Sequence, residues 1–176
     1  MKKILFTLVF VATAIVASAQ IYVGGNIGYW NNNNSDVKTF KIAPEFGFNL
    51  DEKISIGSTI EYSFSDYGSK MHGFGINPYA RYTIYKTGIV SIFTDAGINF
   101  TYYKVQDGDS GTTWGLGIKP GISIALNEKF SIVTHLGFLG YRNADEDIPE
   151  EVLPVEPGFG FDLNGNTLEF GIYYSL

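Results

Sequence analysis

From Phe40 to Leu50, apolar residues alternate strictly with polar or small ones, and this pattern constrains the fold more than any other feature of the chain. A period of two gives a β-strand one apolar and one polar face. The alternation returns along most of the chain, and no helical period competes with it beyond the first 19 residues. We therefore predict an all-β fold of eight strands. The predicted strands are residues 21–30, 38–50, 54–65, 73–85, 89–103, 112–126, 130–141 and 166–176.

Short turns alternate with longer connections along the chain. The turns are residues 51–53, 86–88 and 127–129, and the longer connections are 31–37, 66–72, 104–111 and 142–165. Short turns at one rim and long loops at the other are typical of outer-membrane barrels. About ten residues tilted by about 45° climb roughly 23 Å, close to the apolar band of about 25 Å in such barrels. The pattern predicts an eight-stranded antiparallel up-and-down transmembrane β-barrel, whose closure removes the exposed sheet edges.

The N-terminus has the features of a secretory signal. Lys2 and Lys3 precede an apolar run that ends at Val16, and small residues follow up to Ala19. The run is too short to span a bilayer, which needs roughly twenty residues. We expect a signal peptide over residues 1–19, cleaved after Ala19, and a barrel domain over residues 20–176. The chain has no cysteine, so we expect neither a lipid-anchored cysteine nor a disulfide.

Charge separates the candidate classes of protein. Without Lys2 and Lys3 the chain carries 10 basic and 18 acidic residues, which excludes a nucleic-acid partner. Alternation fits both a membrane barrel and a soluble lipocalin-like barrel, but a water-facing exterior should be rich in charge. Here 17% of residues are charged, against about 25% in ordinary domains. The polar face is mostly glycine, serine, threonine and asparagine, which favours a narrow lumen.

About one ionisable residue per strand lies on this polar face, and we expect these residues to form a layer across the middle of the barrel. They are Glu45, Glu61, Arg81, Asp95, Lys119, His135 and Glu169. One interpretation is an ion path or proton relay. The other is a paired, hydrogen-bonded plug, favoured because unpaired charges in a narrow interior are costly and eight strands leave room only for side chains. Of the two histidines, we place His135 in the lumen and His72 in a loop.

Two other features concern the strands themselves. Aromatic residues gather near both ends of the predicted strands, as in the interfacial girdles of outer-membrane barrels. Pro44, Pro78 and Pro120 recur at the same point of three similar hairpins. Because proline donates no ladder hydrogen bond, we expect a bulge or irregular pairing at each proline.

The C-terminus carries a motif of its own. Glu169 is followed two residues later by Gly171, then by Tyr174 and the terminal Leu176. This resembles the assembly signal of outer-membrane barrels. Together with the hairpin repeat, residues 20–176 resemble the small eight-stranded outer-membrane β-barrel family of Gram-negative bacteria, although members of this family usually end in phenylalanine. The resemblance implies location in the outer membrane, contact with its lipids, insertion by the barrel assembly machinery and escort by periplasmic chaperones.

The family resemblance does not fix an activity. We expect a sealed barrel with a structural or surface-interaction role, displaying loops to an extracellular ligand, with the acidic segment 142–158 as the candidate surface. Neither histidine stands in a recognisable serine–histidine arrangement, so we expect no catalytic residue, and we expect no cofactor or metal. The alternatives are a narrow pore, an enzyme that modifies outer-membrane lipid, and a soluble exported barrel that binds an apolar ligand.

Overall fold

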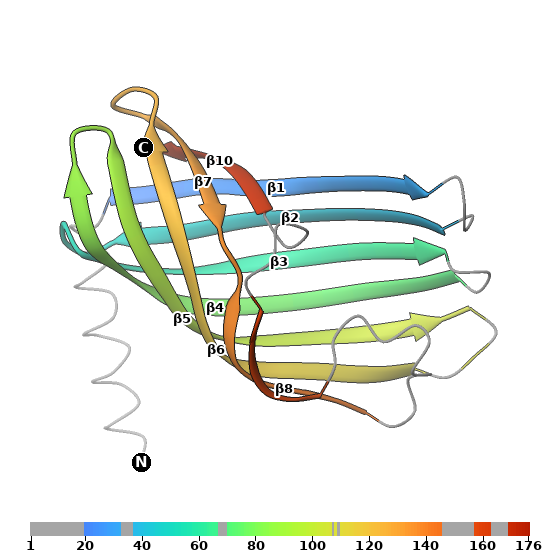
Figure 1. Ribbon diagram of the computed structural model, residues 1–176. Coiled ribbons are helices and arrows are strands. Elements are labelled where there is room, and N and C mark those ends of the chain that lie inside the picture. The colour runs from blue at the N-terminus through green and yellow to red at the C-terminus, as the bar shows by residue number, and fades with distance from the viewer. Residues whose placement is uncertain are drawn as a thin grey trace, which may run out of the picture.

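The computed structural model describes residues 20–32, 37–66, 70–106, 108, 110–145, 157–162 and 169–176, and it consists of strands (Figure 1). The predicted signal peptide and most of the acidic segment 142–158 lie outside these residues. Among the described residues, no helix is long and apolar enough to cross a membrane. The strands are β1 (Gln20–Asn32), β2 (Val37–Asn49), β3 (Ile54–Asp66), β4 (Lys70–Thr87), β5 (Val90–Val105), β6 (Ser110–Ala125), β7 (Phe130–His135), β8 (Phe138–Ala144), β9 (Gly158–Asp162) and β10 (Glu169–Ser175).

These segments form the predicted closed antiparallel barrel. Strands β1 to β6 pair in sequence order, and β6 then pairs with both β7 and β8. Strand β9 pairs with β8, whereas β10 pairs with β7 and returns to β1. Segments β7 and β8 thus share the seventh position of the barrel, and β9 and β10 share the eighth. The eight-stranded architecture is confirmed.

The closing contact joins the two ends of the chain. Residues Tyr22 to Gly25 of β1 pair with Ile172 to Ser175 of β10. The amide of Leu176 also donates to the carbonyl of Ile21 at 2.9 Å. An even number of barrel strands brings the described ends of the chain to the rim of short turns, opposite the long connections.

Strand β4 begins earlier than predicted. It starts at Lys70 rather than at residue 73, so His72 lies in a strand, and its predicted place in a loop was wrong. His72 pairs in register with Phe64 of β3 and with Lys104 of β5. Because Phe64 and Lys104 pair with His72, the β3–β4 and β4–β5 ladders continue past the residues whose alternation predicted the strand.

The seventh strand is broken where the sequence predicted one segment, 130–141. Gly121 of β6 lies opposite His135, but Ile118 lies opposite Leu139, which shifts the register by one residue. Gly137 lies in the break with φ near 149°. The shift faces Pro120, so the irregular pairing expected at this proline is confirmed.

The other two prolines interrupt a ladder without shifting it. The β2–β3 register shows no paired residues at Ala43 and Pro44, and the β4–β5 register shows none at Asn77 and Pro78. The register is the same on both sides of each interruption. Each proline therefore interrupts pairing with the second strand of its own hairpin, because proline has no backbone N–H to donate to that strand.

The last predicted strand also differs from the structure. Residues 166–176 were predicted as one segment, whereas β10 begins at Glu169 and the short β9 lies inside the predicted connection 142–165. Strand β9 carries Phe159 and Phe161 among three glycine or aspartate positions, which is an alternating pattern too short to stand out in the sequence.

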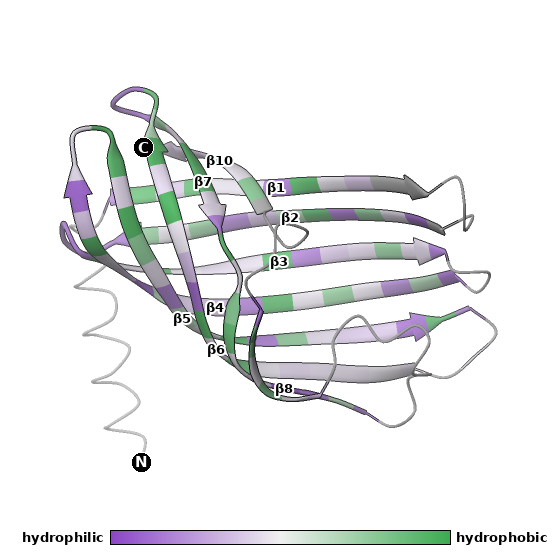
Figure 2. Cartoon of the chain, in the orientation of Figure 1, coloured by the Kyte–Doolittle hydropathy of each residue, from purple (hydrophilic) through white to green (hydrophobic). Residues whose placement is uncertain are grey.

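The apolar faces of the strands point outward. Phe46 and Ile60 are 46% and 51% exposed, whereas Glu45 and Asp95 are 5% and 4% exposed. Figure 2 shows hydrophobic and hydrophilic residues alternating along the strands. Buried apolar side chains lie in the lumen, where Tyr22, Phe93, Val133 and Tyr173 form one cluster. This arrangement suits an exterior of hydrocarbon and an interior of polar groups.

Candidate functional site

Glu45 of β2 is the centre of a hydrogen-bonded network inside the lumen. Its carboxylate accepts hydrogen bonds from the hydroxyls of Tyr173 at 2.6 Å, Thr59 at 3.2 Å and Tyr79. The guanidinium of Arg81 lies 3.6 Å from the same carboxylate. A buried carboxylate needs such partners to offset its desolvation. Glu45 therefore links strands β2, β3, β4 and β10 across the interior.

Arg81 connects Glu45 to a second carboxylate. Its Nε and Nη2 donate to the two oxygens of Asp95 at 2.7 Å and 2.9 Å, a bidentate geometry. The guanidinium carbon lies 4.1 Å from the ring centroid of Phe93. His135 Nε2 lies 2.8 Å from Asp95 Oδ2, the oxygen that also accepts from Arg81 Nη2. Two carboxylates, one arginine and one histidine are thus held together in the lumen.

Tyr22 joins this network from β1. Its hydroxyl lies 2.5 Å from that of Tyr79. The ring fits because two neighbouring residues are glycines: a Cβ added at Gly47 would overlap the Tyr22 hydroxyl and ring, and a Cβ at Gly57 would crowd both tyrosine hydroxyls. Small residues on the polar face therefore make room for large ones from neighbouring strands. We call the seven residues Tyr22, Glu45, Tyr79, Arg81, Asp95, His135 and Tyr173, together with Phe93, the plug.

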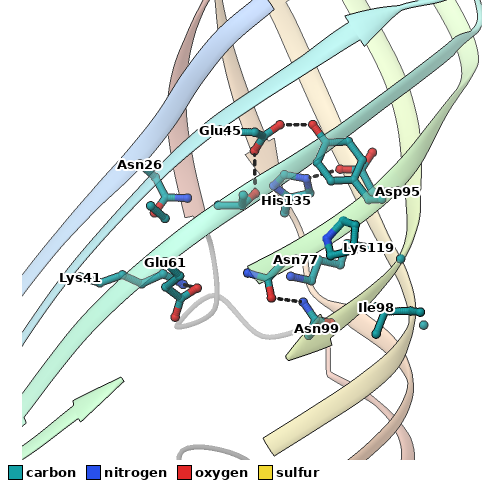
Figure 3. A pocket seen from close by; sticks show the side chains of 16 residues that line it. Asn26, Lys41, Glu45, Glu61, Asn77, Asp95, Ile98, Asn99, Lys119 and His135 are labelled. Atoms are coloured by element: carbon teal, nitrogen blue, oxygen red, sulfur yellow. Dashed lines mark hydrogen bonds and ion pairs between the residues drawn. The ribbon is translucent and has the colours of Figure 1, made fainter. Parts of the chain in front are cut away.

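A small cavity of about 50 Å³ lies on the long-loop side of the plug (Figure 3). Lys41 Nζ and Glu61 form an ion pair at 3.0 Å along one wall, and the amides of Asn77 and Asn99 meet at 3.2 Å. Lys119 also lines this cavity. A second cavity of about 280 Å³, lined by Arg81, Phe93 and Tyr173 among others, lies on the short-turn side. Four plug residues line each of the two cavities.

The predicted layer of ionisable residues is divided between these levels. Glu45, Arg81, Asp95 and His135 meet in the plug. Glu61 and Lys119 line the cavity beside it, and Glu61 pairs with Lys41 instead of with the plug. The side chain of Glu169 lies outside what the structure describes, although its backbone lies opposite His135.

The three plug tyrosines were not predicted. Tyr22, Tyr79 and Tyr173 occupy polar-face positions, where most residues are small. A bulky tyrosine on a face of glycine and serine is the sequence signal that could have found them. Their hydroxyls supply the donors that Glu45 requires, so the plug depends as much on tyrosine as on charge.

The residues of the predicted assembly signal lie in β10 and just beyond it. Gly171 is buried against Tyr173 and the carbonyl of Gly25, whereas Leu176 is exposed at the short-turn rim. The ring of Tyr174 packs 5.0 Å from that of Phe130. Within the described part of the chain, no group of three or more histidine, cysteine, aspartate or glutamate residues is arranged to hold a metal ion.

Known outer-membrane proteins share this architecture. The model of the family described as "Outer membrane protein beta-barrel domain" matches residues 4–175. The outer membrane protein OprG from Pseudomonas aeruginosa is similar in structure, with a TM-score of 0.52 at 10% identity over 90% of this chain and 96% of that one. Neisserial surface protein A (NspA) matches with a TM-score of 0.48 at 14% identity over 89% and 92% of the two chains. No curated protein sequence matches the chain.

Proposed function

This chain belongs to the outer membrane protein β-barrel domain family and is an integral outer-membrane barrel, and on that premise we propose that its lumen is sealed and that it acts as a structural and surface-interaction protein. The family removes the soluble apolar-ligand barrel from the alternatives. A sealed barrel offers its loops, its rims and its lipid-facing wall for interaction, rather than a path through the membrane.

The plug is the observation that supports sealing. Its side chains come from β1, β2, β4, β5, β7 and β10, so they reach into the lumen from most of its circumference. The cavity on the long-loop side is lined by Glu45, Tyr79, Asp95 and His135. The cavity on the short-turn side is lined by Tyr22, Arg81, Phe93 and Tyr173. Because the charged members pair with one another, moving any one of them out of the path would leave a partner buried without its counter-charge.

Conductance in a planar bilayer tests this proposal. The purified wild-type barrel is expected to give no steady open steps, because a lumen sealed by the plug would have no continuous water path. The double variant Glu45→Ala/Arg81→Ala removes two large central side chains while keeping their charges balanced, and it should conduct. A second variant, Phe93→Ala, opens the same level without changing charge.

The controls decide how the recordings are read. Lys41→Ala/Glu61→Ala removes an ion pair that lies beside the cavity and not in the plug, so this variant should remain silent. Each variant must first show the heat-modifiable gel mobility of a folded barrel. Steady steps from the wild type would establish the narrow pore instead, and silence from both folded plug variants would contradict the assignment of these residues as the seal.

The proposal includes the absence of catalysis. In the described residues, His72 Nδ1 is bonded to the hydroxyl of Tyr62 at 3.0 Å and His135 to Asp95, so neither histidine is hydrogen-bonded to a serine nucleophile. Mutating both histidines should leave the outer-membrane lipids of a producing cell unchanged. A lipid modification that depends on the protein and disappears in His72→Gln/His135→Gln would support the enzyme.

The proposed partners follow from the location. We assign recognition by the barrel assembly machinery to β10, which holds Gly171 and Tyr174 at the closing seam, and to Leu176 just beyond it at the short-turn rim. Leu176→Phe should raise the amount of folded barrel in the outer membrane, because phenylalanine is the usual last residue of such barrels. Fractionation with heat-modifiable mobility measures this yield, and an unchanged yield would contradict the role given to Leu176.

A further inference from the structure

The outward face of β2 to β5 carries basic residues at the long-loop rim. Lys38 lies opposite Asp66 of β3, and Asp66 lies opposite Lys70 of β4. One step closer to the middle of the barrel, His72 of β4 lies opposite Lys104 of β5. Three lysines and a histidine on neighbouring strands thus surround a single aspartate.

These side chains face away from the lumen. Met71, Gly73, Tyr103 and Val105 alternate with them along β4 and β5 and are buried inside, where Met71, Tyr103 and Val105 pack together. Lys38, Lys70 and Lys104 are exposed. The ammonium of Lys104 donates to the carbonyl of Gly108 at 3.2 Å, which leaves its other two donors for another ligand.

An aromatic layer lies directly beside this charge. Phe40 and Phe64 lie opposite each other in the same row as His72, and the next row contains Tyr62, Phe74 and Tyr102. The rings of Phe64 and His72 are 5.2 Å apart, and those of Tyr62 and Phe74 are 5.1 Å apart. The surface therefore changes from basic to aromatic to aliphatic within a few residues of each strand.

His72 is positioned as a donor on this boundary. The hydroxyl of Tyr62 lies 3.0 Å from its Nδ1. When this hydroxyl donates, the neutral imidazole carries its proton on Nε2, which is then free to donate outward. Within the described residues no hydrogen bond to Nε2 is present. The Nε2–H of His72, oriented by the hydroxyl of Tyr62, is therefore suited to donate to an anion that approaches from the membrane side.

We propose that Lys38, Lys70, His72 and Lys104, here called the outer basic patch, bind the phosphate headgroup of a lipid in the outer leaflet. The acyl chains of the lipid would then lie along the exposed aromatic and aliphatic side chains below, such as Phe74 and Ile76. Long loops of outer-membrane barrels face outward, so the patch lies at the level of the outer-leaflet headgroups. The inference rests on the membrane location and is independent of whether the lumen is sealed.

Two features favour a lipid over a soluble anion. The patch borders directly on the apolar wall, so headgroup and chains would be bound together on adjoining rows of side chains. The chain as a whole is acidic, with a formal charge of −6, and would repel a free anion at long range. A local group of three lysines in an acidic protein therefore points to a ligand that the membrane already holds next to it.

Native mass spectrometry of the purified barrel tests the proposal. The detergent-solubilised protein is titrated with a glycolipid that carries one phosphate monoester (monophosphoryl lipid A) and with the same glycolipid after phosphatase treatment. The wild type should bind the phosphorylated form at least about tenfold more tightly, since each lysine near an anionic headgroup strengthens association several-fold. Lys38→Gln/Lys70→Gln/Lys104→Gln should lose this preference, and Lys70→Glu alone should weaken it.

A matched triple variant provides the control. Lys53, Lys86 and Lys129 are exposed at the short-turn rim, and Lys53→Gln/Lys86→Gln/Lys129→Gln should keep the preference for the phosphorylated lipid. Equal binding of the two glycolipids by the wild type, or equal losses in both triple variants, would overturn the proposal. Binding of inorganic phosphate that depends on the same lysines, with no preference between the glycolipids, would identify a soluble-anion site and would also overturn it.

Discussion

Tyr173 donates a hydrogen bond of 2.6 Å to Glu45, although 128 positions separate the two residues in the sequence. Tyr173 belongs to the last strand and Glu45 to the second, so the bond passes over the first strand, which lies between them. The hydroxyl of Tyr79 donates to the other oxygen of the same carboxylate. The seam of the barrel is therefore closed by side chains inside the lumen as well as by the backbone ladder.

Replacing the carboxylate at the centre of the plug should be costly. Glu45→Ala leaves three hydroxyl donors without their acceptor and removes one counter-charge of Arg81, so we expect the free energy of unfolding to fall by about 3 kcal/mol. Glu61→Ala is the matched control, because its partner Lys41 is half-exposed and such a pair contributes about 1 kcal/mol or less. Urea unfolding in detergent micelles measures both values, and equal losses would contradict the special role of Glu45.

Arginine should not be replaceable by lysine in the plug. Arg81→Lys keeps the charge but loses the bidentate contact with Asp95 and the contact of the guanidinium with the Phe93 ring. We expect the free energy of unfolding to fall by about 2 kcal/mol, the range of one charged hydrogen bond. The same urea experiment measures this change. If the variant unfolds at the wild-type urea concentration, the guanidinium geometry is not what stabilises the network.

The glycine beside Tyr22 should tolerate no side chain. Gly47→Ala would place a methyl group against the Tyr22 ring and hydroxyl, and we expect a loss of roughly 1–3 kcal/mol from overpacking. At Gly28 an added Cβ would meet the Cβ of Lys41 at an ordinary 3.8 Å, so Gly28→Ala should be nearly neutral. Thermal shifts of the gel-mobility transition measure both, and a neutral Gly47→Ala would show that Tyr22 moves freely.

One short turn should respond to acid. Asp51 accepts backbone hydrogen bonds from Lys53 at 2.7 Å and from Ile54 at 2.8 Å, and these bonds lower the pKa of the Asp51 carboxyl. Because its pKa is lower in the folded state, the carboxylate stabilises the barrel at neutral pH. This contribution is lost as the pH falls through the lowered pKa, below about pH 4. Asn127 makes the same two contacts in another turn without titrating.

The comparison of these two turns supplies the test. Asp51→Asn should keep both backbone bonds, as Asn127 does, while making the free energy of unfolding less dependent on pH in the acid range. Unfolding experiments between neutral pH and pH 2 on the wild type and this variant measure the difference. Identical pH profiles would show that the titration of Asp51 is not linked to folding.

The break in the seventh strand should require glycine. Gly137 has φ near 149°, a conformation that side chains disfavour, so Gly137→Ala should lower the free energy of unfolding by about 1–3 kcal/mol. Gly160 of β9 has open space around an added Cβ and provides the matched control in Gly160→Ala. A stable Gly137→Ala variant would mean that the β7–β8 break adapts its backbone to the side chain.

Much of the fold was predictable because one signal repeats. The period of two assigns each side chain to a face, and the scarcity of charged residues on the polar face identifies that face as the lumen. Glu45, Arg81, Asp95 and His135 were therefore found as lumen residues from their positions alone. Strand breaks were harder to predict. The one-residue shift between Ile118 and Gly121 reverses the phase of the alternation, since Val133 and Phe138 are both buried, but apolar residues on both phases of segment 130–141 hide this reversal in the sequence.

The contacts within the lumen could not be predicted from the pattern. Whether Glu61 meets Arg81 or Lys41 depends on the stagger between strands, which alternation does not specify. The tyrosines were missed for a related reason, since Tyr22 fits only because Gly47 and Gly57 lie beside it on neighbouring strands. Which large side chain lies beside which glycine depends on the register between strands, and the alternation within one strand does not specify that register.

The seam of the barrel also sets the order in which the molecule can be completed. In the described chain, the first strand meets the last through Tyr22 to Gly25 and the final residues 172–175. The sheet can therefore close only once these residues are in place, because they pair with β1 on one side while β10 pairs with β7 on the other. Without them β1 and β7 would keep unpaired edges, which are sites of aggregation and of pairing with other chains.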